Sequence, residues 1–131
     1  MPDKKTLVVI GLILTLVLLA ACSAQGGSGP TKAVEAYLQA LVSKDAAKIV
    51  TLSCASWESQ AQTEVDSMTA VSAKLDSLSC QDAGTDGASS LVTCKGKIVA
   101  TYNNEAQDIP LEGRTYKVSQ ESNEWRVCGY K

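Results

Sequence analysis

The stretch AVEAYLQALVSKDAA, residues 33–47, decides the fold of this 131-residue chain. Apolar side chains recur in it at the spacing i, i+3, i+4, i+7 and i+8, which places them on one face of an amphipathic helix. The helix is expected to begin at Pro30, which suits a first-turn position, or one residue later with Thr31 as its cap. The residues of the apolar face are Val34, Tyr37, Leu38, Leu41 and Val42.

Two shorter helices are expected after this one. Asp45 is suited to cap a helix from Ala46 to about Leu52. Ser56 is suited to cap a third helix, on whose polar side Glu64 and Asp66 are expected to face water. The apolar positions of this third helix are Trp57, Ala61, Val65 and Met68.

From residue 70 onward the pattern changes to strands. Alternating apolar residues shift phase at Leu78, as they do in a strand with a bulge. Three helices followed by four antiparallel strands predict the α+β class, with one face of the sheet buried against the helices. The expected strands are Ala70–Gln81, Leu91–Tyr102, Asp108–Gln120 and Glu124–Tyr130, with a turn over 82–88 after the first.

The first 21 residues have the pattern of a secretory signal peptide. Lys4 and Lys5 form a charged n-region, and the apolar run from Leu7 to Ala21 forms an h-region. About 15 residues of helix rise roughly 22 Å, which is short of the ~30 Å hydrocarbon core. A signal peptide is therefore favoured over a permanent membrane-spanning helix.

The tetrapeptide Leu19-Ala20-Ala21-Cys22 resembles the lipobox of bacterial lipoprotein precursors. In those precursors a diacylglyceryl group is attached to the cysteine sulfur, and a peptidase cuts before the cysteine. The resemblance implies that Cys22 is lipidated and that its acyl chains hold the protein to the outer face of the cell membrane. Ser23 in place of Asp favours the outer membrane in a cell that has one. Ordinary signal cleavage with an unmodified Cys22 is the alternative.

The chain then divides into a signal peptide over 1–21, the lipidated cysteine with a Gly/Ser-rich tether over 22–30, and one domain over 31–131. Without residues 1–21 the chain has 10 basic and 13 acidic residues, a net charge of −3. The sequence contains neither a basic stripe nor a nucleic-acid-binding motif, so no nucleic-acid partner is expected.

Four cysteines remain once Cys22 is assigned to lipid. An even number in a chain bound for an oxidising compartment indicates two disulfides, with three connectivities open. Zinc is the competing use, but these cysteines are 26, 14 and 34 positions apart and the chain has no histidine. No metal and no other cofactor is expected. The four are Cys54, Cys80, Cys94 and Cys128.

Two segments together resemble the NTF2-like superfamily, in particular its small bacterial lipoproteins of unknown function. They are residues 33–47 and the closing run Glu124-Trp125-Arg126-Val127-Cys128-Gly129. The resemblance covers most of residues 31–131. It implies an NTF2-like (cystatin-like) cone, in which three N-terminal helices pack on a curved four-stranded sheet. It implies no reaction, because this fold carries enzymes and binding modules alike.

The expected hairpin and the NTF2-like fold together indicate which of the four cysteines pair. Cys80 and Cys94 lie equally far from Gly87 in the first hairpin, so they face each other on adjacent strands. In NTF2-like folds the segment after the second helix runs beside the last strand, which implies that Cys54 lies near Cys128. The preferred pairing is therefore Cys80–Cys94 and Cys54–Cys128.

NTF2-like enzymes use the cone between the helices and the sheet, and the resemblance implies a cavity there. Candidate cavity-lining residues are Tyr37, Tyr102, Arg114 and Tyr116. For each tyrosine the alternative is ordinary packing with the hydroxyl at the rim. No catalytic residue is assigned, because no histidine, no clearly inward Asp and no free Cys–base pair is available.

The leading hypothesis is a non-enzymatic extracytoplasmic domain that binds a small apolar ligand or an envelope protein. A small isomerase or hydrolase that uses the cone is the first alternative. A structural spacer or assembly subunit, including a homodimer through the sheet, is the second. An inward carboxylate within hydrogen-bond reach of Tyr37 or Tyr102 would favour catalysis, whereas a cone filled by apolar side chains would favour neither a ligand nor catalysis.

Overall fold

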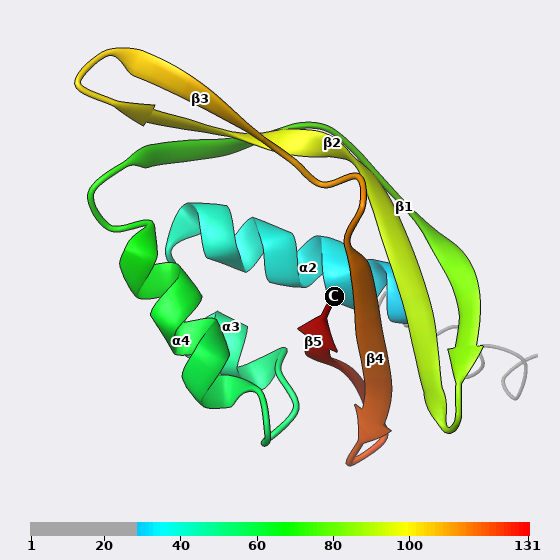
Figure 1. Cartoon of the computed structure of the whole chain (residues 1–131). Coiled ribbons are helices and arrows are strands. Elements are labelled where there is room, and N and C mark those ends of the chain that lie inside the picture. The colour runs from blue at the N-terminus through cyan, green and yellow to red at the C-terminus, as the bar shows by residue number, and fades with distance from the viewer. Residues whose placement is uncertain (1–28) are drawn as a thin grey trace, which may run out of the picture.

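A computed structural model describes residues 29–131, in which three helices are followed by a five-stranded antiparallel sheet (Figure 1). The α+β class is thereby confirmed. The signal peptide, Cys22 and tether residues 23–28 lie outside the described residues. In order along the chain the elements are α2 (Pro30–Ser43), α3 (Ala46–Thr51), α4 (Glu58–Ser67), β1 (Ser72–Asp86), β2 (Ser89–Tyr102), β3 (Glu105–Pro110), β4 (Thr115–Glu121) and β5 (Glu124–Tyr130).

Helix α2 is the centre of the core. Pro30 occupies its first turn after Gly29 at the cap position, so Thr31 is not the cap. The helix ends where Lys44 adopts a left-handed conformation with φ 59°. Its apolar face is buried against the sheet, and Figure 1 shows α2 lying beneath the arch of β1 and β2. The residues that it buries are Ala33, Val34, Tyr37, Leu38, Ala40, Leu41 and Val42.

The two shorter helices lie to one side of α2 (Figure 1). The side chain of Asp45 accepts a hydrogen bond of 2.9 Å from the backbone N–H of Lys48, which is the cap predicted for α3. Helix α4 begins at Glu58 with Trp57 at its cap position, so Ser56 is not its cap. Ala61 and Val65 are the residues by which α4 joins the core.

The predicted strand Asp108–Gln120 is wrong, because the chain there forms two strands. The sheet order is β1-β2-β4-β5, and β3 pairs with the far end of β2. Between β3 and β4 the chain leaves the sheet, because Pro110 has no N–H to donate and Gly113 takes a φ of 90°. Leu111, fully buried, anchors this break in the core. The sheet thus has five strands where four were expected.

Strand β1 continues to Asp86, through most of the segment predicted as a turn, and the turn itself is Gly87-Ala88. The predicted bulge near Leu78 is confirmed, since the register with β2 shifts between Asp76 and Ser79. Gly96 faces this bulge at a φ of 98°, and a Cβ there would lie 2.5 Å from the carbonyl oxygen of Ser77. Glycine is therefore required at that point.

Two disulfides staple the domain. Cys80 and Cys94 are directly opposite in the β1–β2 register, with Cα atoms 4.0 Å apart. Cys54 is joined to Cys128 with Cα atoms 4.8 Å apart. Beside this second disulfide, the N–H of Cys54 donates to the carbonyl of Val127 at 2.8 Å. The pairing is the one preferred from the sequence. No helix in residues 29–131 is long and apolar enough to cross a bilayer.

Candidate functional site

The register across β2, β4 and β5 separates two faces of the sheet. Residues directly opposite one another on neighbouring strands share a face. One row belongs to the inner face, which packs against α2, and the next row belongs to the outer face. The inner row is Val92, Tyr116 and Tyr130, and the outer row is Leu91, Lys117 and Gly129.

Glu64 is the centre of a polar network at the edge of the inner face. One of its carboxylate oxygens accepts a hydrogen bond of 2.7 Å from the hydroxyl of Tyr37, and the other accepts one of 2.9 Å from the hydroxyl of Tyr130. The prediction that Glu64 faces water is therefore wrong. It lies three residues after Ala61, at the border of the buried face of α4, where a side chain reaches the core.

Trp57 extends this network to the edge of the sheet. Its indole Nε1–H donates to the hydroxyl oxygen of Tyr37 at 3.1 Å. Its ring meets that of Tyr130 edge-on, with centroids 5.8 Å apart and planes at 72°. The indole also lies against Gly129, where an added Cβ would be 3.4 Å from the ring. Glu64 thus holds Tyr130 directly and Trp57 through Tyr37.

Burial keeps the tyrosines of this network protonated. Desolvation, followed by the hydrogen bond to Glu64, raises the pKa of Tyr37 far above its ordinary value. The same causes in the same order raise the pKa of Tyr130 to about 12. Both hydroxyls are therefore donors to Glu64 at neutral pH.

Arg114 and Tyr116 join the network through Tyr130. The Tyr116 and Tyr130 rings lie 5.3 Å apart, and the guanidinium carbon of Arg114 is 5.1 Å from the Tyr130 centroid, a cation–π contact. Burial raises the pKa of Tyr116, and nearby Arg114 opposes the rise. The Tyr116 hydroxyl is buried and has no well-formed hydrogen bond to any described residue.

Three of the four residues predicted to line a cavity are therefore brought together. Tyr37, Arg114 and Tyr116 meet around Tyr130 and Glu64. Tyr102 does not join them, because it is 59% exposed at the last position of β2. Its place in the alternation of β2 predicted an inward side chain, but the strand extends beyond the helices that cover its other end. The expectation of an inward Tyr102 is not met.

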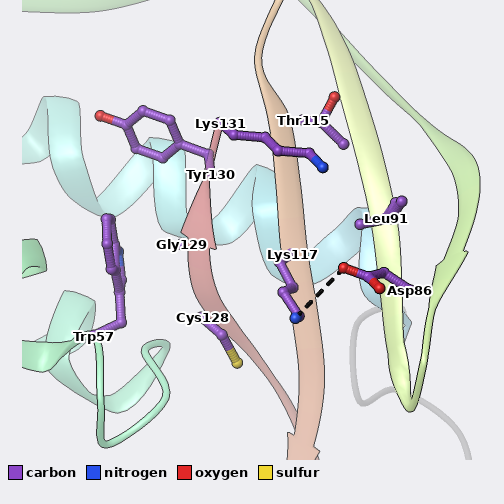
Figure 2. Close-up of a pocket in the computed structure, with 9 residues that line it drawn as sticks. All are labelled: Trp57, Asp86, Leu91, Thr115, Lys117, Cys128, Gly129, Tyr130 and Lys131. Atoms are coloured by element: carbon purple, nitrogen blue, oxygen red, sulfur yellow. Dashed lines mark ion pairs between the residues drawn. The ribbon is translucent and has the colours of Figure 1, made fainter.

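A groove of about 320 Å³ lies on the outer face, across β2, β4 and β5. Figure 2 shows it between Trp57 on one side and Leu91 and Asp86 on the other, with an ion pair of 3.6 Å between Lys117 and Asp86. Gly129, at a φ of 136°, leaves room in the outer row for the Trp57 ring. Trp57 and Tyr130 thus border both the inner network and the outer groove. The remaining lining residues are Thr115, Cys128, Tyr130 and Lys131.

Sequence reasoning missed the groove and three residues of the network. Trp57 was predicted at an apolar position of the third helix and does pack against the core, but its hydrogen bond to Tyr37 and its place at the groove were not predicted. Glu64 was predicted to face water, and Tyr130 only to lie in the last strand. The periodicity of α4 could have placed Glu64 at the buried border, whereas the groove depends on strand register. In residues 29–131 no cluster of three or more His, Cys, Asp or Glu side chains is arranged to hold a metal ion.

Comparison of the chain with protein-family models, with curated proteins and with solved structures finds no match.

Proposed function

We propose that this chain is an extracytoplasmic lipoprotein, anchored through lipid on Cys22, whose NTF2-like domain binds a small, largely apolar ligand without catalysis. The ligand site is the groove beside Trp57. The observation that carries the proposal is this groove, a hollow of about 320 Å³ whose lining includes the aromatic side chains of Trp57 and Tyr130 and the aliphatic side chain of Leu91.

The cysteine pattern supports the anchor. The chain has five cysteines, and the four in residues 29–131 are joined in two disulfides. Cys22 therefore has no cysteine of its own chain left to pair with, and lipid is the use that its lipobox implies. Disulfides also suit an oxidising compartment outside the cytoplasm. Loss of palmitate labelling in Cys22→Ala, with labelling of the unchanged protein, is the expected outcome in cells.

The order of elements supports the NTF2-like assignment. Three helices precede an antiparallel sheet, and the longest helix lies under its curve (Figure 1). The extra strand arises where the expected third strand breaks at Leu111, so the antiparallel path from β1 to β5 is kept.

The groove has the size and the walls of a small-molecule site. Ligand pockets are typically about 300–1,000 Å³ and mostly apolar with a few polar groups. Trp57, Leu91 and Tyr130 supply apolar surface here, and Thr115 supplies a hydroxyl. The aromatic walls are held in place, because Tyr130 and Tyr37 both donate to Glu64 and Tyr37 accepts from Trp57.

Catalysis is the second candidate, and one observation favours it. Glu64 is an inward carboxylate 2.7 Å from the Tyr37 hydroxyl, which is the arrangement that an acid–base site in the cone requires. Its two oxygens, however, already accept hydrogen bonds from two tyrosines. A substrate proton would have to compete with both donors. The side chains of the buried core between α2 and the sheet are apolar apart from the tyrosine hydroxyls and supply no further carboxylate or base there.

A fluorescence titration with the neutral probe N-phenyl-1-naphthylamine tests the binding proposal. The protein is the full mature chain, residues 22–131, with Cys22→Ser so that no detergent is needed. Saturable binding is expected, and Leu91→Asn should weaken it at least about threefold, since each buried methylene contributes about 0.8 kcal/mol. Val99→Asn is the matched control, because Val99 lines a different hollow on the outer face. Absence of saturable binding, or equal effects of the two changes, would contradict the proposal.

A further inference from the structure

The charged groups along the groove balance one another. The ammonium of Lys117 lies 3.6 Å from the carboxylate of Asp86, so these two charges offset each other. Lys131 is the last residue of the mature chain used in the binding test, and its terminal carboxylate offsets its own ammonium. The groove therefore has no excess of either charge with which to attract an anion or a cation, and an uncharged ligand is favoured.

The ion pair of the groove is open, whereas another lysine ion pair of the sheet is closed. Lys97 donates a hydrogen bond of 2.6 Å to the carboxylate of Asp108. The 3.6 Å between Lys117 and Asp86 is too long for a good hydrogen bond, and both side chains are about half exposed. Neither side chain is hydrogen-bonded to another side chain or backbone group in residues 29–131. The donors of this ammonium and the acceptors of this carboxylate are therefore open to a ligand.

The open pair lies between the apolar walls of the groove. In the outer row, Lys117 is directly opposite Leu91 on one neighbouring strand and Gly129 on the other. Gly129 has no side chain, and the indole of Trp57 lies against it. Figure 2 shows the result, with Trp57 on one side of Lys117 and Leu91 on the other. A ligand in the groove thus meets apolar surface and the open ion pair together.

Hydroxyl groups suit an open ion pair better than a charged group does. A hydroxyl both donates and accepts, so it can accept from the ammonium of Lys117 and donate to the carboxylate of Asp86. A ligand anion would have to compete with Asp86 for the ammonium, and a ligand cation would have to compete with Lys117 for the carboxylate. A vicinal diol, with hydroxyls on adjacent carbons, can engage both side chains at once. Hydrogen bonds to charged groups are also stronger than those between neutral groups.

We propose that the groove binds an uncharged small molecule with a vicinal diol, whose two hydroxyls bridge Lys117 and Asp86. The apolar body of this molecule packs against Trp57, Tyr130 and Leu91. The inference rests on the proposed function and names the class of its ligand. The volume of about 320 Å³ is near the lower limit for ligand pockets, which suits one small molecule. The open pair selects the diol over an anion of similar size.

Three phenyl ethers of similar size test this class of ligand. They are 3-phenoxypropane-1,2-diol, phenoxyacetate, which carries an anion in place of the diol, and propyl phenyl ether, which lacks both groups and reports on the apolar walls alone. Each displaces N-phenyl-1-naphthylamine from the mature chain with Cys22→Ser, and the displacement gives its affinity. The diol is expected to bind about three- to tenfold more tightly than phenoxyacetate, since hydrogen bonds to partly exposed charged groups contribute modestly.

Changes at the open pair supply the decisive signs. Asp86→Ala removes the acceptor and should weaken the diol about three- to tenfold, while phenoxyacetate should bind more tightly because Lys117 is freed for it. Lys117→Met keeps the apolar stem and should weaken both compounds. Neither change should alter the affinity of propyl phenyl ether. Lys97→Met and Asp108→Ala make the same changes in the closed pair, which lines a different hollow, and should have no effect.

The outcomes separate this inference from the proposed function. A diol affinity that falls in Asp86→Ala and in Lys117→Met, but not in the two closed-pair controls, would support the inference. Phenoxyacetate that binds as tightly as the diol, or equal effects of the open-pair changes and their controls, would overturn the diol preference while leaving ligand binding intact. Failure of N-phenyl-1-naphthylamine to bind would overturn the proposed function together with the inference.

Discussion

The two faces of the sheet across β2, β4 and β5 differ in how their polar groups are satisfied. On the inner face, Tyr37 and Tyr130 donate hydrogen bonds to Glu64, and Trp57 donates one to the hydroxyl of Tyr37. On the outer face, the charged groups are exposed, and the ammonium of Lys117 lies 3.6 Å from the carboxylate of Asp86. If the groove binds a ligand as proposed, the inner face provides rigidity and the outer face provides recognition. Changes inside should therefore alter stability, and changes outside should alter binding.

The largest effect is expected from the Cys54–Cys128 disulfide, which joins the segment after α3 to β5. Cys54–Cys128 spans a sequence separation of 74 and fixes the segment before Trp57, whose N–H donates to the carbonyl of Cys54 at 2.8 Å. Replacing both cysteines by alanine should lower the free energy of unfolding by about 4 kcal/mol on the chain-entropy account. Urea denaturation measures this. Binding of the neutral probe should weaken as well, because Trp57 loses its support.

The Cys80–Cys94 disulfide is the matched control for that change. It spans only 14 positions within one hairpin, so its removal should cost about 3 kcal/mol. Neither cysteine lines the groove, and probe binding to the folded protein should be unchanged. Equal loss of binding in the two double variants would contradict the special role of the Cys54–Cys128 bridge.

Removing the hydroxyl of Tyr37 should break the inner network. Tyr37→Phe takes a donor from Glu64 and an acceptor from the Trp57 indole, at a fully buried position. The free energy of unfolding is expected to fall by about 2–3 kcal/mol, because a hydrogen bond to a charged group is lost and buried partners are left unpaired. Tyr102→Phe makes the same chemical change on an exposed side chain and should cost less than about 0.5 kcal/mol. Equal losses in the free energy of unfolding for the two variants would show that the hydrogen bonds of Tyr37 do not stabilise the fold.

Alkaline pH should also act on the inner face. Burial and the hydrogen bond to Glu64 raise the pKa of Tyr130 from 10.0 to about 12, and they raise that of Tyr37 further. A group whose pKa is higher in the folded protein stabilises it below the unfolded value, and this stabilisation is lost as pH rises through the folded value. Urea midpoints should therefore fall between pH 10 and about 12. In Tyr130→Phe this fall should be smaller, and a flat profile in the unchanged protein would contradict the account.

The smallest effect on stability is expected on the outer face. Asp86→Asn removes an ion pair between two half-exposed side chains, so the free energy of unfolding should change by less than about 0.5 kcal/mol. Thermal denaturation at low and at moderate salt measures this. A decrease in the free energy of unfolding above about 1 kcal/mol would mean that the ion pair stabilises the fold. It would contradict the claim that only the inner face contributes to stability.

Local sequence patterns predicted the elements that have a strong apolar periodicity or a residue suited to a cap or a bulge. The apolar face of α2, the Asp45 cap and the bulge near Leu78 follow from neighbours a few residues apart. The segment from residue 108 to residue 120 was predicted as one continuous strand, but it contains the end of β3 and most of β4. The sequence signals for a break were Pro110 and Gly113, and they carry meaning only once β2 is known to pair with β3 and then β4.

The candidate site was predictable only in part. Tyr37 follows from the apolar face of α2, and Tyr116 from alternation in the strand that holds it. The periodicity of α4 could have placed Glu64 at its buried border, but the tyrosine partners of Glu64 follow only from the tertiary structure. The groove likewise depends on Leu91, Lys117 and Gly129 lying in one row. Both are products of tertiary arrangement, to which residues distant in the sequence contribute.

The most direct test of the groove is an NMR titration of the mature chain with 3-phenoxypropane-1,2-diol, followed by ¹H–¹⁵N amide shifts. The account predicts saturable shifts that are largest at the lining residues Leu91, Lys117, Gly129 and Lys131, and at the Trp57 indole. It also predicts smaller shifts around Ser72–Lys74 and Val99–Thr101, which line another hollow of the outer face. Shifts that are largest at that second hollow, or that do not saturate, would contradict the central claim.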